Sequence, residues 1–256
     1  MPTNAIVRPP GTNFAEGLTT VDMGAPILEK AVEQHERYCE ALQRCGLTLT
    51  RLEAALCYPD STFVEDTAIL TDRCVILTRP GAPSREGEVP SIKEVLVRFY
   101  PSFHVITPPG TLDGGDVCRA GDHFFIGISG RTNEEGARQL AGFLAQEKYT
   151  SVCIDIRRIK SILHLKSGLA YLGDNRLVLI DVLAEQEAFR RYDIVRIEAV
   201  ENYAANCVRV NDHILLAAGY PVLSGTVRNF GYPVITLEMS EFRKMDGGLS
   251  CLSLRF

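Results

Sequence analysis

One order of elements, a helix, a strand, a loop and a β-hairpin, recurs along this 256-residue chain. Residues 27–46 place apolar side chains at helical spacing and end in Gly46, which predicts a helix closed by a left-handed cap. A short apolar run and a turn-rich loop follow. The segment "AILTDRCVILTRPG" then predicts a hairpin whose β-rich arms flank Thr71 and Asp72. Recurrence of such a unit limits the fold to architectures built from repeats.

The same order returns three more times. The next hairpins are predicted to turn at residues 121–122 and 174–175, and a further one lies within "NCVRVNDHILLAAG". Each follows a predicted helix and a predicted strand. The helices are "SIKEVLVRFY", "TNEEGARQLAGFLAQEK" and "EQEAFRRY".

A fifth round is incomplete, because "SGTVRNFG" and "PVITLEM" are followed by only one hairpin arm, "LSCLSLRF". Residues 4–11, "NAIVRPPG", resemble the outgoing arm of the first hairpin, "VILTRPG". We therefore expect the N-terminal strand to pair with the C-terminal one and to close residues 1–256 into a single catalytic domain. The fold class predicted is α/β, a five-bladed pseudo-symmetric α/β propeller of ββαβ-type repeats around a central polar pocket. Periodicity alone leaves a mixed α/β sandwich open, and the pairing of the termini favours the ring.

One polar residue stands just before each hairpin: Asp66, Asp116, His164, Asn206 and Cys251. In a ring of repeats, corresponding positions face the same axis. Polar groups cost free energy in an apolar interior, so this set predicts a polar pocket on the axis.

A cysteine beside a histidine and carboxylates is suited to nucleophilic attack on an sp2 carbon, with the histidine moving the protons. Taken singly, Cys251 and His164 are each more typical of a buried core residue. A metal site would use the same side chains, but no pair has the spacing usual for zinc, so we expect no resident metal.

Carboxylates are abundant around this position: "YPDSTFVED" contains Asp60, Glu65 and Asp66, and "GTLDGGD" contains Asp113 and Asp116. Carboxylates raise the pKa of a nearby thiol and so weaken it as a nucleophile. A cationic substrate would neutralise them on binding. A guanidinium is planar, permanently charged and able to pair with carboxylates through two hydrogen bonds, so it fits this pocket.

Composition excludes several partners. The formal net charge is -5 with both signs interspersed, which does not suit a nucleic-acid partner. No apolar run approaches the length of a membrane span, and the N-terminal residues do not read as a signal peptide, so we expect a cytoplasmic protein without a membrane partner. The eight cysteines are scattered without C-x-x-C pairs and are read as reduced thiols.

Seven segments together carry a resemblance to a known family: "FVED", "RPGAPSR", "GTLDGGD", "RTNEEGARQL", "HLKSGLAYL", "YAANC" and "KMDGGLSCLSL". In this order they resemble the guanidino-group modifying superfamily of amidinotransferases and deiminases, and within it the dimethylarginine dimethylaminohydrolases. The resemblance implies a five-bladed α/β propeller. It also implies hydrolysis of Nω-methylated arginines, asymmetric dimethylarginine and monomethylarginine, to citrulline and dimethylamine or methylamine.

The resemblance implies the catalytic residues as well. Cys251 is expected to attack the guanidinium carbon and form a covalent thiouronium-type intermediate, and His164 to protonate the departing amine and then activate water. Asp113 occupies a third catalytic position that is glutamate in some relatives, so whether its shorter side chain reaches His164 stays open. The substrate-binding residues implied are Leu18 in a lid segment, the carboxylates Asp60, Glu65 and Asp66, the α-carboxylate ligands Arg85 and Arg131, and Met245.

Two other functions stay open from the sequence. One is an arginine deiminase-like hydrolase that releases ammonia, against which Lys166 counts, because deiminases of this superfamily resemble "H-x-D" where this chain has "HLK". The other is a catalytically silent relative that binds guanidino ligands. The resemblance implies no cofactor, and it leaves open whether zinc inhibits at Cys251 and His164 and whether the chain forms a homodimer.

Overall fold

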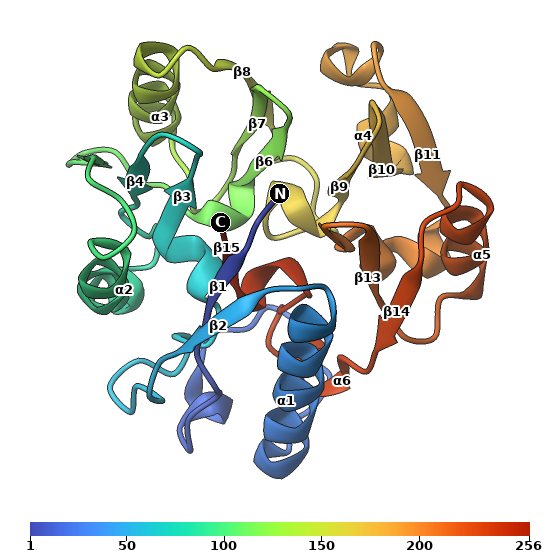
Figure 1. Ribbon diagram of the computed structural model, residues 1–256, viewed down its shortest axis with the longest axis horizontal. Helices are drawn as coiled ribbons and strands as arrows, with labels where there is room; N and C mark the ends of the chain where they lie inside the picture. The colour runs from blue at the N-terminus through green and yellow to red at the C-terminus, as the bar shows by residue number, and fades with distance from the viewer.

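Five three-stranded sheets surround a common axis in the computed structural model, which describes residues 1–256 (Figure 1). In every sheet the inner strand is antiparallel to the middle strand, and the middle strand is parallel to the outer one. The five-bladed propeller is therefore confirmed. From the axis outwards the sheets are β3 (Ala68–Leu70), β4 (Val75–Leu77) and β5 (Phe103–Val105); β6 (Val117–Ala120), β7 (His123–Ile128) and β8 (Thr150–Asp155); β9 (Leu169–Gly173), β10 (Arg176–Ile180) and β11 (Asp193–Ile197); β12 (Val208–Val210), β13 (His213–Ala217) and β14 (Val234–Leu237); and β15 (Leu254–Arg255), β1 (Asn4–Val7) and β2 (Thr48–Arg51).

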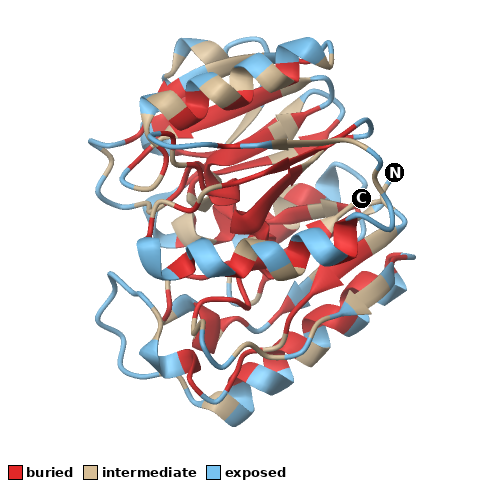
Figure 2. Ribbon diagram, turned by 90° about the vertical axis from the view of Figure 1, so that its left-hand side faces the viewer, coloured by how far each residue is buried: buried red, intermediate tan, exposed pale blue.

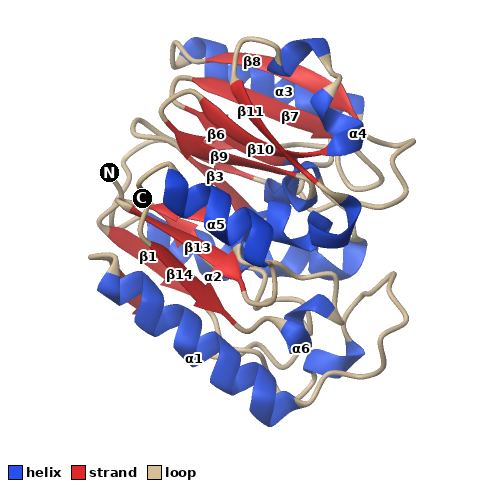
Figure 3. Ribbon diagram, turned by 90° about the vertical axis from the view of Figure 1, so that its right-hand side faces the viewer, coloured by secondary structure: helices blue, strands red, loops and turns tan.

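A helix joins each middle strand to its outer strand, because two parallel neighbours cannot be connected by a tight turn. These helices lie on the outside of the ring (Figure 3). In chain order they are α1 (Leu28–Arg44), α2 (Val89–Leu96), α3 (Glu134–Gln146), α4 (Asp181–Ala184) and α5 (Pro221–Asn229), and a further short helix, α6 (Ser240–Arg243), follows β14. None of the helices combines the length and hydropathy that crossing a bilayer requires.

The helix expected at residues 185–192 is wrong. The structure has the four-residue α4 before this segment and a 3₁₀ turn at Glu187–Phe189 within it. Its three apolar residues, Ala188, Phe189 and Tyr192, all lie in its second half, so a helix begun at Glu185 would have no apolar side chain among its first three residues. The fully buried Phe189 holds the chain against the core instead.

The two termini meet in the fifth sheet. β15 is antiparallel to β1, with Ala5 opposite Arg255 and Ile6 opposite Leu254. Both ends of the chain lie near the axis, side by side (Figure 1). The pairing expected from residues 4–11 is therefore present in the structure. The C-terminal arm, however, is shorter than expected: Ser250–Leu252 forms a 3₁₀ helix, and only the last residues form strand.

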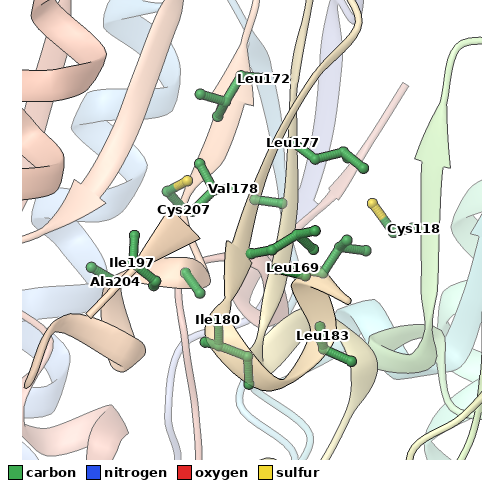
Figure 4. Close-up of a cluster of buried hydrophobic side chains, with 14 of the residues drawn as sticks. Cys118, Leu169, Leu172, Leu177, Val178, Ile180, Leu183, Ile197, Ala204 and Cys207 are labelled. Atoms are coloured by element: carbon green, nitrogen blue, oxygen red, sulfur yellow. The ribbon is translucent and has the colours of Figure 1, made fainter. Parts of the chain in front are cut away.

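Apolar side chains fill the space between the sheets and their helices, so the buried residues follow the strands and the inward faces of the helices (Figure 2). The largest cluster includes the fully buried Leu172, Leu177 and Val178 of the third sheet (Figure 4). Full burial of such a side chain stabilises the fold by roughly 1.5–3 kcal/mol. These clusters hold the sheets rigidly around the polar axis.

Each inner strand is preceded by a short 3₁₀ helix, and this repeated element places the site residues. The five helices are Val64–Thr67, Gly114–Asp116, Leu165–Ser167, Ala199–Ala205 and Ser250–Leu252. Asp66, Asp116 and Cys251 lie within these turns, whereas His164 immediately precedes one and Asn206 immediately follows one. Cys251 thus lies on a turn, and its expected placement in the hairpin arm "LSCLSLRF" is wrong.

Candidate active site

Eight of the ten predicted site residues line a single pocket at one end of the axis. They are Leu18, Asp60, Asp66, Arg85, Arg131, His164, Met245 and Cys251. The side chains of Phe63 and Leu163 add apolar surface to the same pocket. Loops of the first, second, third and fifth sheets, distant in sequence, contribute to it, so the pocket exists only when the ring is closed.

Asp113 lies just behind the pocket and is completely buried. Its Oδ2 atom lies 3.1 Å from Nε2 of His164, and its Oδ1 atom accepts a hydrogen bond of 2.7 Å from the backbone N–H of Gly81. The aspartate therefore does reach the histidine, despite being shorter than the glutamate of some relatives. The hydrogen bond fixes the orientation of the imidazole ring.

His164 is held in its charged form by neighbouring carboxylates. Burial alone lowers the pKa of this histidine, but the charges of Asp66 and Asp116 and the hydrogen bond that the ring donates to Asp113 outweigh burial and raise the pKa to about 9. An imidazolium at neutral pH can donate a proton to a leaving group. Resting His164 is thus prepared to act first as an acid.

Cys251 is partly buried and faces the same pocket. Burial, followed by the charges of Glu65 and Asp66, raises the pKa of its thiol to about 12. The resting side chain is therefore a thiol. A bound cation would offset the nearby carboxylates and favour the thiolate.

Asp66 stays ionised although its side chain is buried. Burial raises the pKa of this carboxyl, but His164, Arg85 and the N–H of Gly115 together lower it to about 2. Oδ2 accepts a hydrogen bond of 2.6 Å from Nη1 of Arg85, and Oδ1 accepts one of 2.8 Å from the Gly115 N–H. A fixed negative charge therefore lies beside the cysteine and the histidine.

Most of the Arg85 guanidinium is used inside the protein. Nε and Nη2 donate to the buried carboxylate of Glu88, and Nη2 also donates to the carbonyl of Phe63 at 3.0 Å. With Nη1 bonded to Asp66, one N–H of Nη1 is left for a ligand. Arg131, by contrast, makes no hydrogen bond through its side chain and lines the same pocket.

Asp60 connects the pocket to the segment that contains Leu18 and Thr20, the covering segment. Its Oδ1 atom accepts a hydrogen bond of 3.0 Å from the backbone N–H of Leu18. Burial raises the pKa of Asp60, and Arg85 and the Leu18 N–H oppose this rise. The covering segment is further held by Asp246, whose carboxylate accepts hydrogen bonds from the N–H and hydroxyl of Thr20.

Glu65 does not line the pocket, in contrast to its neighbour Asp66. Its carboxylate lies 2.6 Å from Nζ of Lys166 and accepts a hydrogen bond of 2.7 Å from the Ser250 hydroxyl. Glu65 and Lys166 line a separate cavity around the inner strands. Lys166 therefore places no positive charge in the pocket that contains the cysteine.

Sequence reasoning missed Glu88 and Asp246 as parts of this site. The spacing of Arg85 and Glu88, three residues apart in a helical turn, is a signal that could have revealed their pairing. Asp246 is held by its contact with a segment more than 220 residues away, so no local signal identifies it. Asp66, Asp113 and His164 also bring potential metal-ligand atoms within 4.8 Å of one another, a group that does not include Cys251.

The pocket combines a cysteine, an acid-base histidine and fixed carboxylates, which defines a hydrolase of the guanidino group. The family model described as arginine deiminase matches residues 56–219. The chain is 44% identical over 252 residues to N(G),N(G)-dimethylarginine dimethylaminohydrolase of Pseudomonas aeruginosa, covering 98% of each. It is 33% identical to the protein of the same name from Streptomyces coelicolor, covering 98% of this chain and 96% of the relative. The chain belongs to the dimethylarginine dimethylaminohydrolase family.

Solved structures agree with this assignment. A cysteine-to-serine variant of the Pseudomonas aeruginosa enzyme, complexed with citrulline, superimposes with a TM-score of 0.97 at 43% identity and full coverage of both chains. The N-terminal domain of the cyanobacterial arginine dihydrolase ArgZ has a TM-score of 0.88 at 21% identity, covering 100% of this chain and 97% of that domain. The latter likeness supports the fold alone.

Proposed function

We propose that the pocket hydrolyses Nω-methylated arginines to citrulline and methylamine or dimethylamine, with Cys251 as the nucleophile. The observation that carries this proposal is the common pocket of Cys251, His164 and Asp66, with Asp113 hydrogen-bonded to the histidine behind it. The relatives named above support it, one of them through its bound citrulline.

Substrate binding joins two charged regions of the pocket. Asp66 attracts the guanidinium, while Arg131 and the free N–H of Arg85 take the α-carboxylate. Asp60 and the backbone of Leu18 lie next to each other at the covering segment, where they suit the α-amine. Phe63, Leu163 and Met245 add apolar wall that suits the Nω-methyl groups.

The first chemical step forms the thiouronium-type intermediate. The guanidinium charge favours loss of the Cys251 proton to solvent, and the thiolate attacks the guanidinium carbon. Imidazolium His164 donates its proton to the methylated nitrogen as the carbon–nitrogen bond breaks, and the amine leaves. Asp113 holds the ring in position and stabilises its charge.

The second step consumes water. Neutral His164 takes a proton from a water molecule, whose oxygen adds to the carbon of the intermediate. Collapse of the tetrahedral species breaks the carbon–sulfur bond, its hydroxyl proton passes to solvent, and neutral citrulline is released. Cys251 leaves as thiolate and His164 is again protonated, so the enzyme returns to the protonation state from which the thiolate attacked.

The reaction is tested by a citrulline assay with asymmetric dimethylarginine, monomethylarginine, arginine and agmatine. Turnover of the methylated arginines is expected, and it should be lost in Cys251→Ser and strongly reduced in His164→Ala. Cys57→Ser, at an exposed thiol away from the pocket, is the matched control and should retain activity. Activity on arginine alone would show a deiminase, and binding without turnover would show a silent relative.

We further propose that the reaction needs no cofactor and that Zn²⁺ inhibits it by binding Cys251 and His164, which offer sulfur and nitrogen ligands in one pocket once zinc has displaced their protons. The proposed location is the cytoplasm, where the eight free thiols stay reduced. A homodimer is proposed on the exposed Val97, Phe99 and Val105, and sedimentation of the purified protein tests it.

A further inference from the structure

A second group of metal-ligand atoms lies outside the active site, between the first and second sheets. The Sγ of Cys74, an imidazole nitrogen of His104 and a carboxylate oxygen of Glu147 lie within 4.8 Å of one another. Cys74 immediately precedes β4, and His104 lies on its parallel neighbour β5. Glu147 follows the last residue of α3, the helix of the second sheet, which lies beside β4 in Figure 1. None of the three lines the substrate pocket.

His104 is oriented towards this group and lacks a hydrogen-bond partner. Its buried Nε2 atom makes no hydrogen bond within the protein and lies 3.7 Å from Oε1 of Glu147. Its ring is stacked on Phe143 of α3, with centroids 4.5 Å apart and planes inclined by 17°. An unsatisfied buried nitrogen costs roughly 1–3 kcal/mol unless something binds it. The stacking holds that nitrogen in place.

Cys74 completes the group from the first sheet. Its side chain is fully buried, and its sulfur makes one hydrogen-bond contact, with the hydroxyl of Thr71 at 3.6 Å. Sulfur, imidazole nitrogen and carboxylate oxygen together are the donor set that zinc takes. The separation of 3.7 Å between the histidine and glutamate atoms is close to the ~3.4 Å expected for two ligands of one tetrahedral zinc.

We propose that Cys74, His104 and Glu147 form a structural Zn²⁺ site, with a water molecule as the fourth ligand. On binding, the thiol proton of Cys74 is released to solvent and a sulfur–zinc bond forms, while the imidazole and the carboxylate bind without loss of a proton. The ion joins β4 and β5 to the end of α3 and so ties two neighbouring blades together. Arg73 already donates a hydrogen bond to the backbone carbonyl of Glu147 at the same junction.

Cobalt binding in a Cys251→Ser background tests this site, because that substitution removes the active-site thiol. Co²⁺ alone is the probe, and one equivalent should give a thiolate-to-cobalt charge-transfer band together with the visible bands of a tetrahedral site. Adding Cys74→Ser should abolish the charge-transfer band. The matched control Cys153→Ser, at an exposed thiol, should leave it unchanged.

A second variant guards against a folding defect at Cys74. His104→Phe keeps an aromatic ring against Phe143 but removes the ligand nitrogen. It should lower Zn²⁺ affinity at least about 100-fold in competition with a chromophoric chelator, since even the loss of a residue that only hydrogen-bonds to a metal ligand costs roughly 10–100-fold. It should also remove the zinc-dependent rise of the thermal midpoint. A charge-transfer band that survives loss of Cys74, or a Cys251→Ser protein that binds no stoichiometric metal, would overturn the proposal.

Discussion

Exchange of a neutral ligand for a cationic one in the pocket should raise the reactivity of Cys251. Methylurea and methylguanidinium have nearly the same shape and differ in charge, so both obstruct the thiol equally. Burial, with Glu65 and Asp66, raises the pKa of Cys251 from 9.0 to about 12. Only the cation opposes these carboxylates, so only methylguanidinium should restore the thiolate.

The size of the effect follows from the three-unit rise in pKa. At pH 8 the thiolate fraction falls roughly 1,000-fold, but the remaining thiolate is about 20-fold more nucleophilic, so alkylation slows about 50-fold. A cation about 4 Å from the sulfur interacts with it by about 4 kcal/mol at an effective dielectric constant near 20. That energy corresponds to about three pKa units, enough to recover most of the lost rate.

The assay is alkylation by iodoacetamide at pH 8, followed by mass spectrometry of the peptide that contains Cys251. The exposed Cys57 serves as an internal standard in the same sample. Methylguanidinium should accelerate modification of Cys251 relative to methylurea, and modification of Cys57 should not change. Equal rates with both ligands, or a free enzyme in which Cys251 reacts as fast as Cys57, would refute the electrostatic reasoning.

Three further predictions concern the histidine and the covering segment. Gly115→Ala should lower kcat/KM about 100-fold in the citrulline assay, because a Cβ there would lie 2.6 Å from Nδ1 of His164 and displace the ring. Gly142→Ala, whose Cβ meets open space, should be neutral in the same assay. The free energy of unfolding should fall by about 3 kcal/mol between pH 6.5 and 9. Folding raises the pKa of His164 from 6.5 to about 9, so protonated His164 stabilises the fold fully below pH 6.5, and this contribution is lost as the folded protein deprotonates. Urea titrations that gave parallel pH profiles for wild type and His164→Asn would contradict this assignment. Asp246→Asn should raise KM about tenfold with kcat nearly unchanged, because it weakens the hydrogen bonds to Thr20 but keeps a residue that tolerates the left-handed backbone. A loss confined to kcat would argue against a role of Asp246 in holding the covering segment.

Much of the fold was predictable because its signals are local and repeated. The hairpin turns contain residues that adopt a left-handed backbone, at Gly121, Asp174, Asn175 and Asn211, and such residues mark turns in any sequence. The fifth unit needed the comparison of both chain ends. The 3₁₀ turn at Glu187–Phe189 was not predictable from its segment, because tertiary packing of Phe189 decides its conformation.

The site was predictable as a set of residues but not as a geometry. Cys251 and His164 belong to recurring positions before the inner strands, so their common pocket follows from the repeat. The contact of Asp113 with His164 and the turn of Glu65 away from the pocket depend on distances between separate sheets. Side-chain lengths alone do not determine such distances.

Sequence by itself determined the topology, the closure of the ring and the residue types on its axis, since turn chemistry and hydrophobic periodicity act over a few neighbours. Only the tertiary structure decided the charge states of those residues. The imidazolium of His164 and the neutral thiol of Cys251 result from burial and from carboxylates brought in from other sheets. Such long-range electrostatics depend on the folded distances between charges, which no local pattern contains.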